Sequence, residues 1–198
     1  MVSAEIGSYL VEMLVLKKKT GHVTAKKLSD RLNVSCAAVT QMVRKLDDGD
    51  FVRHESYGEI RLTSRGKKIA KKILAKRRLM RSLLLISGIK RGSRQEAEYL
   101  SSYLSDRVYD SLYTFILESA KSNAGAVPLN KSSLKSKLAV VAITARANTR
   151  KKLQNMGITA GVDITVKDIQ SRSITVHVDS SNQEISKKDA KSILVIPL

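Results

Sequence analysis

The spacing of apolar residues changes once along the chain, and this change limits what the sequence can fold into. Up to about residue 120 most apolar residues recur every three or four positions, as on one face of a helix. After the small, polar and basic stretch KSNAGAVPLNKSSLKS they follow a period of two, in LAVVAI, VDITVKDI and SITVHVDS, with the β-branched residues typical of strands. The sequence therefore predicts a mostly α-helical chain with a small β domain, joined by a linker at 122–136.

The first part of the helical region has the element order of a winged helix-turn-helix. Gly21 and Asn33 are suited to end helices, and Thr24 and Ser35 are N-cap candidates that open the next two. The short connection between those two helices, and the two short strands that follow in DFVRHESYGEIRLT, complete the motif. We therefore predict a winged helix-turn-helix over residues 1–64.

The hairpin and the elements after it are predicted from the same kinds of signal. A turn is expected at 56–58, and Ser64 is expected to cap a helix that contains GKKIAKKILAKRRLMRSLLL. That stretch has eight Lys or Arg residues and no acidic residue. With two further helical patterns it forms a predicted helical domain at 65–121, which is followed by an SH3-like β-barrel at 137–198.

The net charge indicates the kind of partner. The formal charge is +18 and the isoelectric point about 10.1, values that favour a nucleic acid over the weaker alternative of an acidic lipid surface. Aromatic residues make up only 4% of the chain and Trp is absent. Binding to single strands by base stacking needs exposed rings, so the expected partner is double-stranded DNA.

Other function classes lack their residues in this sequence. Cys36 is the one cysteine, so neither a disulfide within the chain nor a cysteine metal cluster can form. His22, His54 and His177 have no metal-ligand spacing, and no set of catalytic residues is evident, so we expect no enzyme. No apolar run is long enough to cross a membrane. The N-terminal order, apolar then basic, is not that of a signal peptide, and the expected location is the cytoplasm.

The helix that begins after Ser35 has the pattern of a recognition helix. Its first turns carry small or polar residues that would let the backbone enter the major groove, and Gln41 can address adenine with two hydrogen bonds. Arg44 and Lys45 are better placed for phosphates. The alternative is that this is a solvated amphipathic helix in a winged helix that binds a protein instead of DNA. The predicted DNA contacts are Ser35, Ala37, Ala38, Thr40, Gln41, Arg44 and Lys45 on this helix, and Arg53, His54 and Arg61 on the hairpin.

Several stretches resemble one family of transcription factors. They are VSCAAVTQMVRKLDDGDFV, LTSRGKKIA, and KRRLMRSLL followed by EAEYLSSYLSDRV, and they resemble the diphtheria-toxin-repressor and manganese-transport-regulator family. The tail, KKLQNMGITAGVDITV and SILVIPL, resembles the FeoA-like SH3-type domain of the longer members. The resemblance implies a homodimer built on the helices after the wing. It also implies a two-fold operator, with one recognition helix for each half-site.

The chain differs from the family at the regulatory metal sites, where His, Glu, Met, Cys or Asp are usual. The corresponding positions here are Ser8, Arg77, Arg81, Arg94, Glu98, Ser101 and Ser102. An arginine stays protonated and offers no lone pair to a metal, so we expect no metal cofactor and a lost or altered dependence on Fe²⁺ or Mn²⁺. Three roles remain open for the arginines: an ion pair of Arg77 or Arg81 with Glu98, binding of an anionic effector, or solvated groups that touch DNA phosphates.

The expected function is a sequence-specific, dimeric DNA-binding transcriptional regulator that acts as a repressor. Two other functions stay open. One is an architectural, chromatin-like protein that coats DNA, which the charge of +18 supports. The other is an adaptor whose barrel docks on a transporter, which the predicted winged helix argues against.

Overall fold

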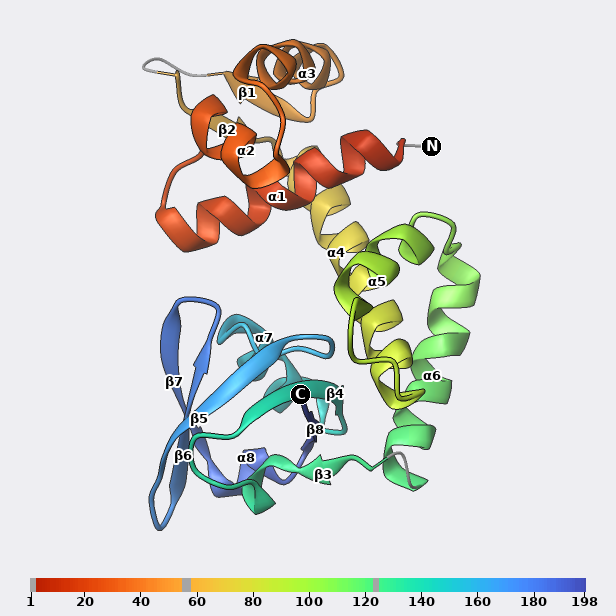
Figure 1. Ribbon diagram of the computed structural model, residues 1–198, viewed down its shortest axis with the longest axis vertical. Coiled ribbons are helices and arrows are strands. Elements are labelled where there is room, and N and C mark those ends of the chain that lie inside the picture. The colour runs from red at the N-terminus through yellow and green to blue at the C-terminus, as the bar shows by residue number, and fades with distance from the viewer. Residues whose placement is uncertain (1–2, 55–57, 123–124) are drawn as a thin grey trace. The chain divides into compact units, whose positions relative to one another are not determined.

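The chain forms two compact units, Met1–Ala75 and Lys76–Leu198. The computed structural model describes residues 3–54, 58–122 and 125–198 (Figure 1). The turn predicted at 56–58 falls mainly on residues 55–57, which lie outside the described residues. In the described ranges, no helix has both the length and the apolar character that crossing a membrane requires.

The elements of the two units can be followed along the colour gradient of Figure 1. The helices are α1 (Ala4–Thr20), α2 (Ala25–Leu32), α3 (Cys36–Asp48), α4 (Ser64–Ile86), α5 (Ser93–Ser101), α6 (Asp106–Ser122), α7 (Ala147–Asn155) and α8 (Lys187–Ala190). The strands are β1 (Val52–His54), β2 (Ile60–Leu62), β3 (Val127–Pro128), β4 (Lys137–Ile143), β5 (Asp163–Ile169), β6 (Ser173–Val178), β7 (Ser181–Ser186) and β8 (Ile193–Pro197). Helix α4 begins in the first unit and ends in the second.

The bounds of the first three helices follow their caps. The side-chain oxygens of Thr24 and Ser35 each accept a hydrogen bond from the backbone N–H three residues further on, at 3.3 Å and 3.1 Å. Gly21 (φ 77°) and Asn33 (φ 53°) adopt the left-handed conformation that ends α1 and α2. These four predictions are confirmed.

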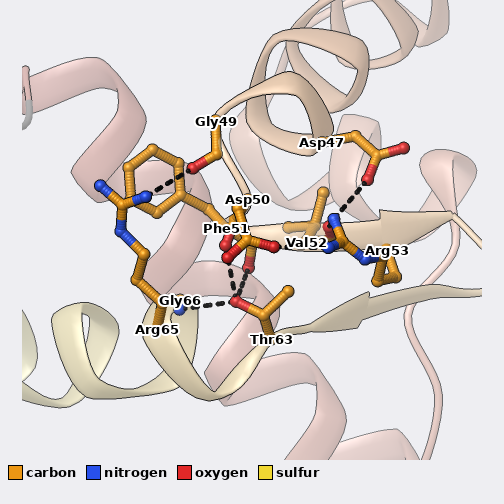
Figure 2. Close-up of polar contacts among 9 residues, drawn as sticks. All are labelled: Asp47, Gly49, Asp50, Phe51, Val52, Arg53, Thr63, Arg65 and Gly66. Atoms are coloured by element: carbon orange, nitrogen blue, oxygen red, sulfur yellow. Dashed lines mark hydrogen bonds and ion pairs between the residues drawn. The ribbon is translucent and has the colours of Figure 1, made fainter.

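The cap of α4 differs from the prediction by one residue. Ser64 is the first residue of the helix, and the side chain before it, Thr63, accepts the hydrogen bond from the N–H of Gly66 at 3.0 Å (Figure 2). The hydroxyl of Thr63 also faces the carbonyl oxygens of Asp50 and Phe51, at 2.8 Å and 3.1 Å. Thr63 therefore joins the start of α4 to the start of the hairpin, which Ser64 does not do.

The core of the first unit is one cluster to which α1, α2, α3, the hairpin and the first half of α4 contribute. The antiparallel pair β1–β2 is attached to the helices by a hydrogen bond of 2.9 Å from Ile60 N to the Val23 carbonyl. On α3 the predicted inward face is confirmed, and the opposite face is left exposed to solvent. The buried side chains of that helix are Val39, Met42, Val43 and Leu46.

The second unit contains a six-stranded antiparallel sheet with the strand order β3-β8-β4-β5-β6-β7. Strand β6 shows the predicted alternation: Ile174, Val176 and Val178 are buried, and Thr175 and His177 are partly exposed. Strand β4 is buried almost throughout, because its two faces belong to different clusters. One face lies in the core of the sheet domain, and the other packs with α4 and α6.

Three features of this unit differ from the sequence-based expectation. Among the described residues no pairing joins β3 to β7, so the sheet is open at its edges and is not a closed barrel. Val127 and Pro128 pair with β8 and Leu129 is fully buried, so part of the predicted linker at 122–136 belongs to the sheet. Strand β7 was not predicted, because Ile185 is its one buried residue and gives too weak a pattern.

Gly66 is expected to be intolerant of even a methyl group. An added Cβ would lie 2.0 Å from the carbonyl oxygen of Phe51, a main-chain atom that the hairpin holds in place. Replacing glycine by alanine inside a helix normally stabilises a protein by about 0.5–1 kcal/mol. Here the overlap should reverse the sign, so that Gly66→Ala lowers the free energy of unfolding by about 1–3 kcal/mol.

Urea unfolding of the full chain measures this change. Lys68→Ala is the matched control, because Lys68 is exposed two residues further along the same helix and its replacement should be neutral or slightly stabilising. A Gly66→Ala protein as stable as the Lys68→Ala protein would contradict the close approach of α4 to the hairpin.

Candidate nucleic-acid interface and arginine cluster

The outward face of α3 is open and built from short side chains. All seven residues predicted to contact DNA from this helix are exposed. The hydroxyl of Ser35 caps the helix, and that of Thr40 donates to the carbonyl of Cys36 at 2.9 Å, so both are partly engaged by their own helix. Gln41 is therefore the side chain of this face best suited to read a base edge, and Ala37 and Ala38 keep the backbone accessible.

The hairpin arginine Arg53 is held by two carboxylates at the end of α3. Its guanidinium lies 3.3 Å from the Asp47 carboxylate and 2.5 Å from that of Asp50, and Figure 2 shows it extended towards Asp47. Arg53 and Asp47 are more than one third exposed, so the pair adds little to stability. Its effect is to fix the hairpin relative to the C-terminal end of α3 and to neutralise much of the charge predicted to meet a phosphate.

The second hairpin arginine, Arg61, is held in a similar way. Glu59 accepts hydrogen bonds from Arg61 and from Lys17 of α1, each at 3.0 Å. The bond to Arg61, followed by the bond to Lys17, lowers the pKa of Glu59 to about 2. The third predicted hairpin contact, His54, is exposed at the end of β1. The contacts of all three with DNA stay predictions.

Sequence reasoning missed the residue that closes this junction. Arg65, in the first turn of α4, donates to the carbonyl of Gly49 at 3.2 Å and places its guanidinium 4.7 Å from the centre of the Phe51 ring (Figure 2). The run DDGD before the single Phe of this region marks the end of α3 in the sequence. Nothing local to Arg65, however, indicates that it turns back to that position.

The arginines predicted to correspond to the family's metal-site residues form ion pairs within the second unit. Arg77 of α4 lies 2.6 Å from the Glu98 carboxylate of α5, which is one of the two pairings left open by the sequence. Arg81 instead lies 2.6 Å from Asp163 of β5, and Arg94 of α5 also pairs with Asp163. Asp163 was not anticipated. It gives the cluster a second carboxylate and so reduces the spare positive charge that an anionic effector would need.

The three serines of the same set donate hydrogen bonds to nearby backbone carbonyls. Ser101 is buried and donates to the carbonyl of Glu98 at 2.9 Å, and Ser102 donates to that of Tyr99 at 2.7 Å. Ser8 belongs to α1 of the first unit, where its hydroxyl donates to the carbonyl of Ala4 at 3.2 Å. These hydroxyls therefore make local bonds to their own helices.

Two family models match the chain, one in each unit. One, described as iron dependent repressor, N-terminal DNA binding domain, covers residues 1–60. The other, described as FeoA domain, covers residues 127–197. The chain therefore combines a DNA-binding domain of the iron-dependent repressors with a C-terminal FeoA domain, which supports the resemblance to the diphtheria-toxin-repressor and manganese-transport-regulator family.

Curated relatives match a part of this chain. The HTH-type transcriptional regulators MntR of Bacillus subtilis (strain 168) and of Bacillus velezensis are each 30% identical to it over 89 residues. Those residues are 45% of this chain and 63% of each relative. The match therefore spans a little under two thirds of the relatives' own length.

Solved structures share the fold over nearly the whole chain. The manganese regulator SloR is 18% identical, with a TM-score of 0.52 and coverage of 98% of both chains. IdeR of T. acidophilum is 20% identical, with a TM-score of 0.53 and coverage of 97% of both chains. A manganese-dependent transcriptional repressor in complex with manganese is 21% identical, with a TM-score of 0.52, and the match covers 98% of this chain and all of the other.

The expectation that this chain has no metal cofactor is contradicted by these relatives. They are a manganese regulator and a manganese-dependent repressor in complex with manganese, and the curated relatives carry the name MntR. The expectation rested on the arginines, whose surroundings bear only on their own cluster. Within the described ranges no three His, Cys, Asp or Glu side chains come together, and both carboxylates of the arginine cluster face guanidinium groups. The arginine cluster itself therefore does not fit a divalent cation.

The low pKa of Glu59 makes a pH-dependent contribution to stability. Because its pKa falls from 4.5 to about 2 on folding, the stabilisation is complete above about pH 4.5 and is lost as the pH falls towards 2. Thermal unfolding of the wild-type protein and of Glu59→Gln measures it. The variant should have the lower Tm at pH 7, and the difference in Tm should shrink steadily below about pH 4.

The matched control for this measurement is Glu118→Gln on α6. Glu118 is exposed on α6, so this replacement should give the same small difference in Tm at every pH. A difference for Glu59→Gln that stayed constant from pH 7 to pH 2 would show that its bonds to Arg61 and Lys17 do not favour the charged carboxylate.

Proposed function

We propose that this chain is a sequence-specific DNA-binding transcriptional regulator, a repressor, that acts as a homodimer on a two-fold operator. The observation that carries the proposal is the exposed face of α3, with short side chains up to Gln41 and with Arg44 and Lys45 behind them. The match of residues 1–60 to a DNA-binding domain of repressors supports it. The proposal includes no catalytic step, in line with the transcriptional regulators to which the chain is similar.

An architectural DNA-coating protein is the second candidate, because the charge is spread over both units. The first unit has 15 Lys or Arg and 8 Asp or Glu, a net charge of +7, and the second has 21 and 10, a net charge of +11. Coating by charge alone would not require a face free of bulky side chains on α3, and this favours the regulator. Competition decides between them: a regulator keeps its operator in the presence of excess random duplex at physiological salt, and a coating protein does not.

Gln41→Ala is expected to weaken operator binding and to relax specificity at one base pair. The operator is first selected from a random duplex library with the full-length protein, both with and without Mn²⁺, because relatives are manganese regulators by name. Loss of a bidentate contact to a base should cost about 1–3 kcal/mol, or roughly 5- to 150-fold in Kd. The measurement is a titration of the selected duplex, repeated with each base substituted in turn.

Gln154→Ala is the control, since Gln154 is an exposed glutamine on α7 of the second unit. It should leave both affinity and sequence preference unchanged. Equal affinity of the wild-type protein for the selected duplex and for random DNA would refute the regulator and favour the architectural protein.

The surface of α5 and α6 supports the proposed homodimer. Tyr99 and Tyr103 are 63% and 76% exposed and touch each other edge to face, with ring centres 5.5 Å apart. On α6, Val108 and Phe115 are 47% and 55% exposed and lie two turns apart on one side of the helix. Large apolar side chains with this much exposure are typical of a surface that a partner covers, and an identical copy is the partner we propose.

Phe115→Glu is expected to shift the protein from dimer to monomer. A carboxylate placed in the apolar surface would be desolvated without a partner, which costs enough to weaken association by at least roughly tenfold. Light scattering after size-exclusion chromatography, over a range of concentrations, measures the mass. Thr114→Glu is the control, because Thr114 is exposed on another side of α6 and its variant should remain dimeric. If both variants had the mass of the wild-type protein, the interface would lie elsewhere.

A further inference from the structure

The loop before β5 lies directly on helix α4, within the second unit. Gly161 has a φ of +78°, and an added Cβ would lie 2.4 Å from the carbonyl oxygen of Arg78 and 2.7 Å from its Cα. The two backbones are therefore in contact, and a side chain at residue 161 would separate them. Such close packing indicates that the FeoA domain is seated on α4 in a defined position.

Three polar contacts join the same loop to α4. The guanidinium of Arg78 donates to the hydroxyl of Thr159 at 2.6 Å. That of Arg81 donates to the carbonyl of Gly161 at 2.7 Å and forms the ion pair of 2.6 Å with Asp163. The three acceptors belong to one five-residue stretch of the FeoA domain, 159–163, and both donors lie on one turn of α4.

Burial decides which of these contacts matters most. The side chain of Arg81 is 9% exposed and that of Asp163 25%, so this pair is largely removed from water. Arg94, which also reaches Asp163, is 69% exposed and contributes little. Burial also lowers the pKa of Arg78, while the charge of Asp179 acts in the opposite direction. A buried guanidinium that loses its carboxylate is strongly destabilising, so Arg81 depends on Asp163.

An apolar contact accompanies the polar one. Ala139 and Val141 of β4 and Ile196 of β8 form one buried cluster with Leu85 of α4 and Ala120 of α6. Apolar contact of this kind is not directional and would allow the domain to shift along the helices. The ion pair and the Gly161 contact are directional and select one position.

We propose that the guanidinium group of Arg81 forms a carboxylate site on α4, with Arg94 of α5 at its exposed side, that Asp163 of the FeoA domain occupies this site, and that the occupancy is a latch holding the domain on α4. Opening the latch releases residues 157–163 from α4 without unfolding the strands of the sheet. The device does not depend on DNA binding, so it stands or fails separately from the proposed function.

Hydrogen exchange of the full-length protein, followed by mass spectrometry without DNA, tests the latch. Asp163→Asn removes the charge and keeps the shape, and it should speed exchange in residues 157–163 at least ~10-fold, while β6 and β8 keep wild-type rates. Asp168→Asn is the matched control on the same strand: Asp168 is exposed and its carboxylate bonds locally, to Ile169 N and the Gln170 side chain. This control should exchange like the wild-type protein.

A double variant separates a latch from a general loss of stability. In Arg81→Met/Asp163→Asn no buried charge is left without a partner, so the loop should exchange more slowly than in Asp163→Asn alone. Gly161→Ala provides an independent route, since its methyl group should displace the loop from Arg78 and speed exchange in the same residues. Additive effects of the two substitutions, or faster exchange across the whole sheet in Asp163→Asn and in Gly161→Ala, would overturn the proposal. So would wild-type exchange of the loop in Asp163→Asn.

Discussion

The packing of the FeoA domain on α4 in the second unit depends on the free-energy cost of removing the Arg81 guanidinium from water. Arg81 lies on a helix that packs against a sheet, and its side chain keeps only 9% of its exposure. It must therefore find a carboxylate and a carbonyl to replace the lost water. Both come from a segment 80 residues later in the chain, at Gly161 and Asp163. This requirement determines which loop of the FeoA domain faces α4, and the apolar cluster beside it supplies the buried area.

Local signals in the sequence were enough for the caps at Gly21, Thr24, Asn33 and Ser35 and for the two faces of α3, because both depend on residues within one or two turns. The partner of Arg81 could not be found in this way. Asp163 is part of the alternating stretch VDITVKDI, where it reads as an ordinary outward residue of a strand. Thr63 was missed for a related reason. Two hydroxyl residues adjoin at the start of α4, and the choice between them depends on carbonyl groups that the hairpin brings near.

The error about the metal has a different origin. Arginine cannot ligate a metal, and in the structure Arg77 and Arg81 face carboxylates, so the local chemistry was sound. The inference from those positions to the absence of any metal cofactor was wrong, because the side chains at one site limit only what that site can bind. Relatives that are manganese regulators by name contradict the wider conclusion. The residue at one corresponding position shows whether that position can bind a metal. It does not show how the protein is regulated.

The carboxylates that hold Arg53 and Arg61 also change what the high formal charge means for binding. When a protein neutralises DNA phosphates, the salt dependence of its affinity reports the number of counterions released. Arg53 and Arg61 are already paired with Asp47, Asp50 and Glu59. They therefore neutralise few DNA phosphates and release few counterions. On the proposed function, each protomer therefore releases fewer ions than its basic residues suggest. A larger part of its affinity then survives in concentrated salt.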